Sequence, residues 1–262
     1  MKKNFQIIGV LTLICFSFFC TEKTVHVIKN TDEIMQKIKD ESEKYNTKYI
    51  DALIVKDTMI PGLSGLSVDE EKSYEKMKRL GKYDPSLYMY NEEKPSISIY
   101  DNYDKYIIKG NSKKRNVSII FYGKLKQLKE IHNLLSSNSI KGSYLLEDIT
   151  EYNKFSSYID EEFDFVINKK TNDKNSDMKI YCYNKDNDSD FLNYCALNKY
   201  FSVQPSLIVE NDLYIKVKQN LDSGLIILLN VNDKTIYELP SVINYLKSKG
   251  YELTNLTELI SE

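Results

Sequence analysis

From residue 117 onward, short apolar runs typical of β-strands alternate with longer amphipathic patterns typical of α-helices. Alternation of this kind predicts a mostly parallel sheet. The run 225–229 is apolar at every position, which fits a strand that is covered on both faces or closed into a barrel. We therefore predict one α/β domain over 117–262. Its expected strands are 117–122, 143–146, 163–167, 179–183, 206–209 and 225–231, and its last long helix is 241–249.

The N-terminus has the pattern of a membrane anchor. Two lysines precede an apolar run at 5–20, which is close to the roughly 17–25 residues of a spanning helix. Cleavage of a signal peptide needs small residues at the end of the run, where this chain has Phe18 and Phe19. We expect residues 1–22 to be an uncleaved signal-anchor with its N-terminus in the cytoplasm; the alternative is a buried core helix.

The patterns between the anchor and the α/β domain are shorter and of mixed type. Residues 23–48 predict a stalk helix, with Asn30 as its cap and Glu33 as the partner of the cap. Residues 49–110 predict a small α+β module, which contains a helix at 69–80 that ends at Gly81. Short strands are expected in this module at 49–55, 87–90 and 97–100.

Charge and histidine content exclude several classes of function. The 36 basic and 38 acidic residues are interspersed and give a net charge of −2. No basic stripe is present, so nucleic acid is not expected as a partner. The only histidines are His26 and His132, which is few for a zinc site or a Ser-His-Asp arrangement. We expect both to be structural.

Three stretches of 117–262 are similar in sequence to a known family, namely 120–123 (IFYG), 224–230 (GLIILLN) and 238–259. Through them this segment resembles the polysaccharide deacetylase (NodB-homology, carbohydrate esterase 4-like) family. The strand ending at 120–123 stands where the family has Thr-Phe-Asp-Asp-Gly. The run 224–230 (GLIILLN) stands where the family has a Gly-apolar-Ile-Leu-Leu-His strand, and 238–259 is similar to the family's closing helix, strand and turn. Residues 24–110 look like the membrane-proximal module of some bacterial members. The resemblance implies a distorted, incomplete (β/α) barrel, preceded by a transmembrane helix and a small α+β module.

The resemblance also implies a catalytic site whose residues this chain lacks. Family members hold a divalent metal such as zinc on one Asp and two His, with a second Asp as base and a late His as acid. The two aspartate positions fall on Tyr122 and Gly123, and the late histidine falls on Asn230. The histidine pair would follow 163–167, where Asn168–Lys170 stand. We therefore expect no catalytic residue and no metal ligand at these positions, and the family metal to be lost.

Carboxylates elsewhere in the domain offer an alternative site. Two of them could form an acid/base pair, although a solvated acidic face is the expectation, because charged residues lie mostly on surfaces. The acidic run 186–190 lacks the Gly at the sixth position and the Glu at the twelfth that a calcium loop needs. The remaining candidates are Asp148, Glu151, Asp160, Glu161, Glu162 and Asp164.

Tyrosines and cysteines complete the set of candidate residues. Tyr122, Tyr181 and Tyr183 are placed at the carboxyl ends of predicted strands, where barrel sites lie. With Asn230 they are the candidate ligand-binding residues.

Cys182 and Cys195 are close in sequence and, by the expected topology, outside the membrane, where a disulfide can form; two unpaired buried thiols are the alternative.

These inferences give one leading hypothesis and two others. We expect a protein of the cell membrane with a single pass and an extracytoplasmic C-terminal domain, which is catalytically inactive and binds a cell-surface glycan or an envelope protein. One alternative is an active hydrolase of the C–N bond of N-acetyl groups in a surface polysaccharide, with displaced ligands. The other is a structural envelope protein without a ligand.

Overall fold

The computed structural model describes residues 29–159, 162–171 and 178–262. The predicted anchor, His26, Asp160 and Glu161 lie outside these residues. Within the described ranges, no helix has both the length and the apolar character that crossing a bilayer requires. The chain forms two compact units. One contains the described part of 1–49 together with 64–93, and the other contains 50–63 and 94–262.

Among the residues that the structure describes, the smaller unit contains two helices with caps, α2 (Glu33–Glu41) and α3 (Glu70–Leu80), and a two-stranded antiparallel sheet. Helix α2 begins after Asp32, whose carboxylate accepts from the N–H of Ile34, so the predicted cap at Asn30 is wrong. Helix α3 begins at the predicted place, and left-handed Gly81 ends it. The strands are β3 (Gly65–Val68) and β4 (Tyr90–Glu93), and residues 85–87 form a 3-10 turn where the sequence predicts the start of a strand. Ile38, Met77 and Tyr88 are the buried residues that hold the helices together.

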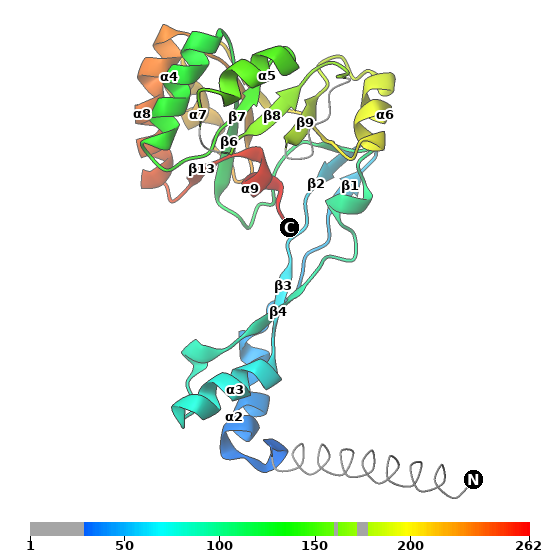
Figure 1. Cartoon of the computed structure of the whole chain (residues 1–262), viewed down its shortest axis with the longest axis vertical. Helices are drawn as coiled ribbons and strands as arrows, with labels where there is room; N and C mark the ends of the chain where they lie inside the picture. Colours follow the sequence, from blue (N-terminus) through cyan, green and yellow to red (C-terminus); the bar gives the residue numbers. More distant parts are fainter. Residues whose placement is uncertain (1–28, 160–161, 172–177) are drawn as a thin grey trace, which may run out of the picture. The chain divides into compact units, whose positions relative to one another are not determined.

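The larger unit is built on one curled, mainly parallel sheet (Figure 1). In spatial order the strands are β1 (Leu53–Val55), β2 (Thr58–Ile60), β5 (Tyr106–Ile107), β10 (Phe201–Val203), β9 (Lys179–Tyr183), β8 (Asp164–Ile167), β7 (Ser143–Leu145), β6 (Asn116–Tyr122), β12 (Ile226–Asn230) and β11 (Leu207–Val209). A final strand, β13 (Glu252–Thr254), pairs with the first half of β6, and β7 pairs with its second half. Every neighbouring pair of these strands is parallel except β1–β2, so the predicted α/β class is confirmed.

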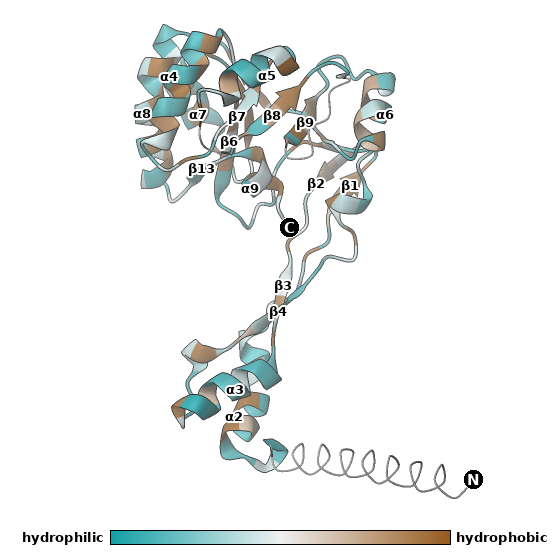
Figure 2. Cartoon of the chain, viewed as in Figure 1, coloured by the Kyte–Doolittle hydropathy of each residue, from teal (hydrophilic) through white to brown (hydrophobic). Residues whose placement is uncertain are grey.

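Helices follow β6, β7, β9, β11 and β12, and hydrophobic and hydrophilic residues alternate along them (Figure 2). Helix α8 begins much earlier than the predicted residue 241. Asn232 caps it in a reciprocal pair with Thr235, and Pro240 lies inside the helix instead of before it. The helices are α4 (Leu125–Ser136), α5 (Ile149–Ser156), α6 (Ser189–Leu197), α7 (Leu213–Asn220), α8 (Asp233–Ser248) and α9 (Leu256–Ile260).

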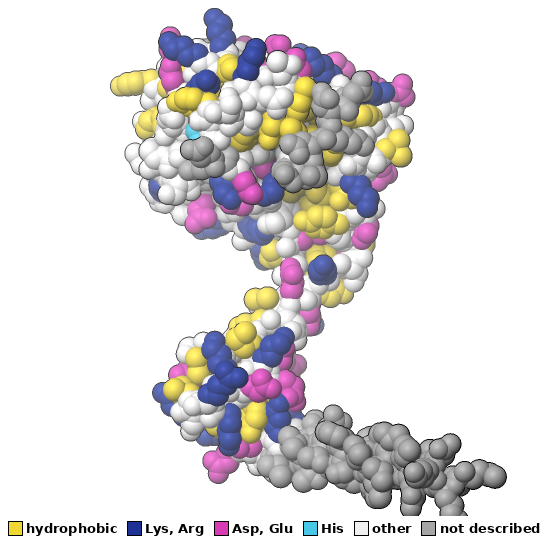
Figure 3. Space-filling model, viewed as in Figure 1, with side chains coloured by type: hydrophobic (Ala, Val, Ile, Leu, Met, Phe, Trp, Pro, Cys, Tyr) yellow, Lys and Arg dark blue, Asp and Glu magenta, His cyan; other side chains and the backbone are white. Residues whose placement is uncertain are grey.

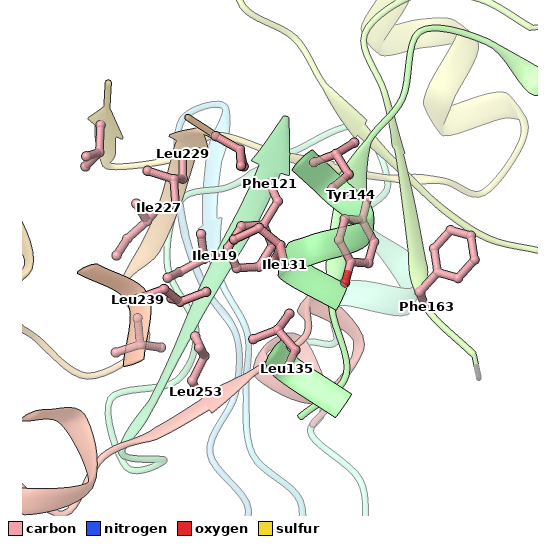
Figure 4. Packing of buried hydrophobic residues seen from close by; sticks show 14 of the residues in the cluster. Ile119, Phe121, Ile131, Leu135, Tyr144, Phe163, Ile227, Leu229, Leu239 and Leu253 are labelled. Carbon is pink, nitrogen blue, oxygen red and sulfur yellow. The ribbon is translucent and has the colours of Figure 1, made fainter. Parts of the chain in front are cut away.

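Both faces of the sheet are buried. Because side chains alternate along a strand, Ile119 and Phe121 of β6 pack with Ile131 of α4 (Figure 4). Ile120, between them, packs on the opposite face in a second cluster, which Leu256 of α9 also joins. Strands that are covered on both faces read as continuous apolar runs, which is why the central strands could be located from the sequence.

The segments 50–63 and 94–110 contribute β1, β2 and β5 to the large sheet. The predicted strand at 97–100 is wrong, because Ile99–Asp101 forms a 3-10 turn. The side chain of Glu262 accepts from the N–H of Gly62 at 2.9 Å and from that of Ile99 at 3.1 Å. Both segments therefore belong to the larger unit, and the domain boundaries at 49 and 110 stay a prediction.

Candidate functional site

The carboxyl ends of four neighbouring strands line a cavity of about 560 Å³. Tyr122 ends β6 and lies directly opposite Asn230, which ends β12. Leu145 ends β7, and Asn168 follows the end of β8. The full lining is Tyr122, Gly123, Lys124, Leu125, Leu145, Leu146, Glu147, Glu151, Asn168 and Asn230. The structure therefore brings together Tyr122, Gly123, Asn168 and Asn230, which the sequence resemblance aligns with catalytic positions of the family.

Tyr122 and Gly123 are the residues that the sequence resemblance aligns with the two family aspartates. Burial raises the pKa of the Tyr122 phenol, and the nearby carboxylate of Glu210 raises it further. The phenol is therefore neutral at physiological pH and can both donate and accept a hydrogen bond. Gly123 has a φ of +154°, and a Cβ at this position would lie 3.1 Å from the carbonyl oxygen of Val231. An aspartate at 123 would thus be strained.

The polar groups of the cavity do not fit the metal that the resemblance implies. Zinc in proteins is held by Cys, His and carboxylate side chains, whereas the matching positions carry a phenol, a glycine and two amides. The carboxylates in the lining are Glu147 and Glu151, and Oε2 of Glu151 accepts from the N–H of Glu147 at 2.7 Å. In the part of the chain that the structure describes, no three His, Cys, Asp or Glu side chains are grouped as metal ligands.

Tyr181 and Tyr183 do not line the cavity. Both lie on β9 and are buried in the cluster on the inner face of the sheet. The hydroxyl of Tyr181 lies 2.7 Å from Oγ1 of Thr257, and burial raises its pKa strongly. Of the four tyrosine and asparagine candidates, the structure therefore brings Tyr122 and Asn230 together and places the other two in the core.

The other carboxylate candidates are used in local structure. Asp164 begins β8, so it lies about 10 Å along the strand from the end that borders the cavity. Asp148 caps α5 by accepting from the N–H of Glu151 at 2.9 Å, and Glu162 pairs with Lys179 at 3.1 Å. Among the described candidates, Glu151 alone reaches the cavity. Lys124 and Glu147 also line the cavity but were not among the candidates; each stands two residues after a strand end and could have been found by that position.

The remaining candidates lie away from the cavity. His132 is buried on α4, with Nδ1 3.3 Å from the hydroxyl of Tyr144, so it belongs to the core. A disulfide joins Cys182 of β9 to Cys195 of α6, with a Cα–Cα distance of 6.5 Å. Both cysteines are fully buried, so the bridge connects the sheet to a covering helix.

Comparisons with known proteins give relatives of similar length. No family model matches the chain. The uncharacterized protein YlxY of Bacillus subtilis strain 168 is 24% identical over 91% of this chain and 87% of its own length. Wild-type BA3943, a CE4 family pseudoenzyme from Bacillus anthracis, has a TM-score of 0.66 at 22% identity and covers 88% of this chain and 96% of its own. A BA3943 mutant with restored enzymatic activity has the same TM-score and identity and covers 88% of this chain and 99% of its own.

Another solved structure matches a smaller part of the chain. PdaA of Bacillus subtilis, a family 4 carbohydrate esterase, has a TM-score of 0.50 at 14% identity over 62% of this chain and 87% of its own. The curled, half-barrel sheet of the larger unit is the distorted barrel of these esterases. The resemblance inferred from the sequence is confirmed at the level of the fold: the chain has the fold of the carbohydrate esterase family 4 proteins.

Proposed function

We propose that this chain is a catalytically inactive deacetylase-like protein that uses the cavity at the strand ends to bind a cell-surface glycan. The observation that carries the proposal is the cavity itself, because it lies at the strand ends that the resemblance aligns with the family's catalytic positions, and its lining there is Tyr122, Gly123 and Asn230. A protein partner at the same cavity is the second occupant to test.

The lining has the chemistry that a sugar requires. The ring of Tyr122 and the side chains of Leu145 and Leu146 offer apolar surface, and the amides of Asn168 and Asn230 both donate and accept hydrogen bonds. Ligand sites commonly combine apolar walls with a few such polar groups. Asparagine cannot transfer a proton as an acid, so these residues support binding without hydrolysis.

The similar fold of BA3943 supports inactivity, since that protein is a pseudoenzyme whose activity a mutant restores. We further propose that residues 1–22 anchor the chain in the cell membrane with the rest outside, as the apolar run and its preceding lysines suggest. The disulfide supports an oxidising compartment, because structural disulfides are rare in the cytosol.

The test is a titration of the full chain, in detergent, with N-acetylated chito-oligosaccharides by calorimetry. Tyr122→Ala should weaken binding about tenfold or more, whereas Tyr122→Phe, which keeps the ring, should weaken it less. Tyr158→Ala, at an exposed position outside the cavity, serves as the control. Equal affinity of wild type and Tyr122→Ala would rule out the cavity, and release of acetate together with stoichiometric metal would favour the hydrolase.

A further inference from the structure

A second cavity, of about 680 Å³, lies between helices α7 and α8. Tyr214 and Ile215 of α7 form one wall, and Tyr237, Ser241 and Asn244 are among the residues that α8 contributes. None of its lining residues belongs to the cavity at the strand ends. We call this second cavity the α7–α8 groove.

Helix α8 carries two separate stripes of side chains. Leu239, Val242 and Leu246 are buried in the core of the larger unit. Tyr237 and Ser248 mark the ends of the other stripe, which lines the groove. At 1.5 Å per residue, this stripe extends along about 16 Å of helix, which is longer than one sugar ring. The groove can thus hold an extended ligand along the helix.

The aromatic residues of the groove differ in exposure. The rings of Tyr214 and Tyr245 pack on each other with centroids 5.7 Å apart, and both are half-buried. Tyr237 is 84% exposed and Ile215 is 53% exposed. Hydrophobic side chains reach the surface among charged ones on the α4 and α8 side of the larger unit (Figure 3). A tyrosine as exposed as Tyr237 contributes little to folding, so its ring is available to a ligand.

The lining of the groove carries one charge and no cation. Glu238 is the charged residue in the lining. Its carboxylate accepts from the N–H of Tyr214 at 3.2 Å and lies 4.0 Å from Nζ of Lys234, which pairs more closely with Asp212. The other polar lining groups are the hydroxyls of serine and tyrosine and the amide of Asn244. An anionic peptide or lipid surface would find no opposing charge in this lining, whereas an uncharged, hydroxyl-rich ligand would match both the aromatic faces and the neutral polar groups.

From this chemistry we infer that the α7–α8 groove is a saccharide-binding site for an uncharged oligosaccharide, with Tyr237 as its principal contact. Sugars present an apolar ring face beside hydroxyls that donate and accept hydrogen bonds, and the groove offers tyrosine rings beside Ser241, Asn244 and Ser248. This site is distinct from the cavity at the strand ends and does not depend on it. Two such sites would let one chain bind a glycan strand at two places, which raises the overall affinity.

The experiment uses the full chain in detergent and chitohexaose, an uncharged oligosaccharide, as the probe. The variants are made in a Tyr122→Ala background, so that the groove is measured alone. We expect Tyr237→Ala to weaken binding tenfold or more and Tyr237→Phe to weaken it less than threefold. Leu197→Ala removes a side chain that is 86% exposed on α6 and outside the groove, and it should leave the affinity unchanged.

The opposite results would overturn the inference. If Tyr122→Ala alone abolishes all binding of chitohexaose, the groove binds no sugar, while the proposed function of the strand-end cavity still stands. Equal affinities for Tyr237→Ala and Leu197→Ala would also refute the groove. The fully deacetylated, cationic hexamer should bind more weakly than chitohexaose, and stronger binding of that hexamer would contradict the neutral character that we infer.

Discussion

Oγ1 of Thr257 donates a 2.6 Å hydrogen bond to Oδ1 of Asp164, which lies 93 residues earlier in the chain. The N–H of Thr257 and the hydroxyl of Ser143 donate to the other carboxylate oxygen at 2.9 and 3.1 Å. Asn255 Nδ2 lies 3.3 Å from Oδ1. This buried network fastens the segment that begins α9 to β7 and β8, and so holds α9 against the inner face of the sheet.

Loss of the Asp164 side chain should destabilise the larger unit. Asp164→Ala leaves the donors of Thr257 and Ser143 buried without an acceptor, and each such group costs about 1–3 kcal/mol. We therefore expect the free energy of unfolding in urea to fall by about 3 kcal/mol or more. The control is Asp186→Ala, at an exposed position, which should change it by less than about 0.5 kcal/mol. A loss below 1 kcal/mol for Asp164→Ala would contradict the network.

The same carboxyl group should make stability depend on pH. Burial raises the pKa of Asp164, although its hydrogen bonds with Thr257 and Ser143 oppose the shift. Between the unfolded pKa of about 3.9 and the raised folded pKa, the folded state binds more protons at this group than the unfolded state. Linkage then requires this group's contribution to stability to fall as the pH rises through that window.

The Asp164→Asn variant isolates this contribution. We expect the difference in free energy of unfolding, wild type minus Asp164→Asn, to be largest near pH 4 and to decrease as the pH rises. Urea titrations from pH 4 to 8 would measure it. A difference that increases with pH would mean that the hydrogen bonds outweigh burial and that the folded pKa is lowered.

The disulfide should protect both of its cysteines and stabilise the fold. Labelling of the denatured, unreduced protein should leave Cys182 and Cys195 unmodified, and reduction should expose both. Their sequence separation is 13, for which loop-closure entropy gives about 3 kcal/mol. The double variant Cys182→Ala/Cys195→Ala should lose about that much stability. Full labelling of both thiols before reduction would show that the bridge does not form in the protein.

The N-terminal segment should remain attached. Phe18 and Phe19 stand where signal peptidase requires small residues. Mass spectrometry of protein extracted from membranes should therefore detect peptides from residues 1–20. As a comparison, Phe18→Ala/Phe19→Ala should create a cleavable sequence. A mature chain that begins near residue 21 in the wild type would refute the anchor.

The protein should neither bind catalytic zinc nor deacetylate chito-oligosaccharides. Loss of a general acid or base costs about 10²–10⁴-fold in rate, and here the ligands that would hold the metal are missing too. Single substitutions that restore one family residue, Gly123→Asp or Asn230→His, should therefore rescue no activity. Elemental analysis and an acetate assay measure both expectations. Stoichiometric zinc with acetate release above a protein-free control would show that the active site lies elsewhere.

The sequence predicted the parts of the fold that its own periodicity specifies. The strands β6, β8 and β9 and the helix α3 were located within one or two residues, because buried strands and capped helices leave strong local patterns. The strands β5 and β10 were missed, since each has two or three residues and exists only through pairing with its neighbours. The predicted helix 241–249 covers only the second half of α8, because Pro240 is typical of a helix start. The helix in fact begins after its N-cap, Asn232.

In the candidate site, too, the sequence located some residues and could not locate others, whose positions depend on tertiary packing. Tyr122 was found because it ends a predicted parallel strand, and Asn230 because the resemblance aligns it with the family's late histidine; the two lie opposite each other. Tyr181 and Tyr183 pack in the same cluster as Tyr122, but their strand, β9, is not among the four strands whose ends line the cavity. Glu151 reaches the cavity from a helix, so its position depends on how α5 packs, which no local pattern specifies.

The backbone at Gly123 opposes a side chain at this position. An added Cβ would lie 3.1 Å from the carbonyl oxygen of Val231, which would have to shift by a few tenths of an ångström, and the φ of +154° disfavours any side chain. An aspartate at 123 would thus reduce stability before it could contribute chemistry. Selection acting on single substitutions would remove such intermediates, so changes elsewhere in the lining can alter what the cavity binds more readily than this position can gain a carboxylate.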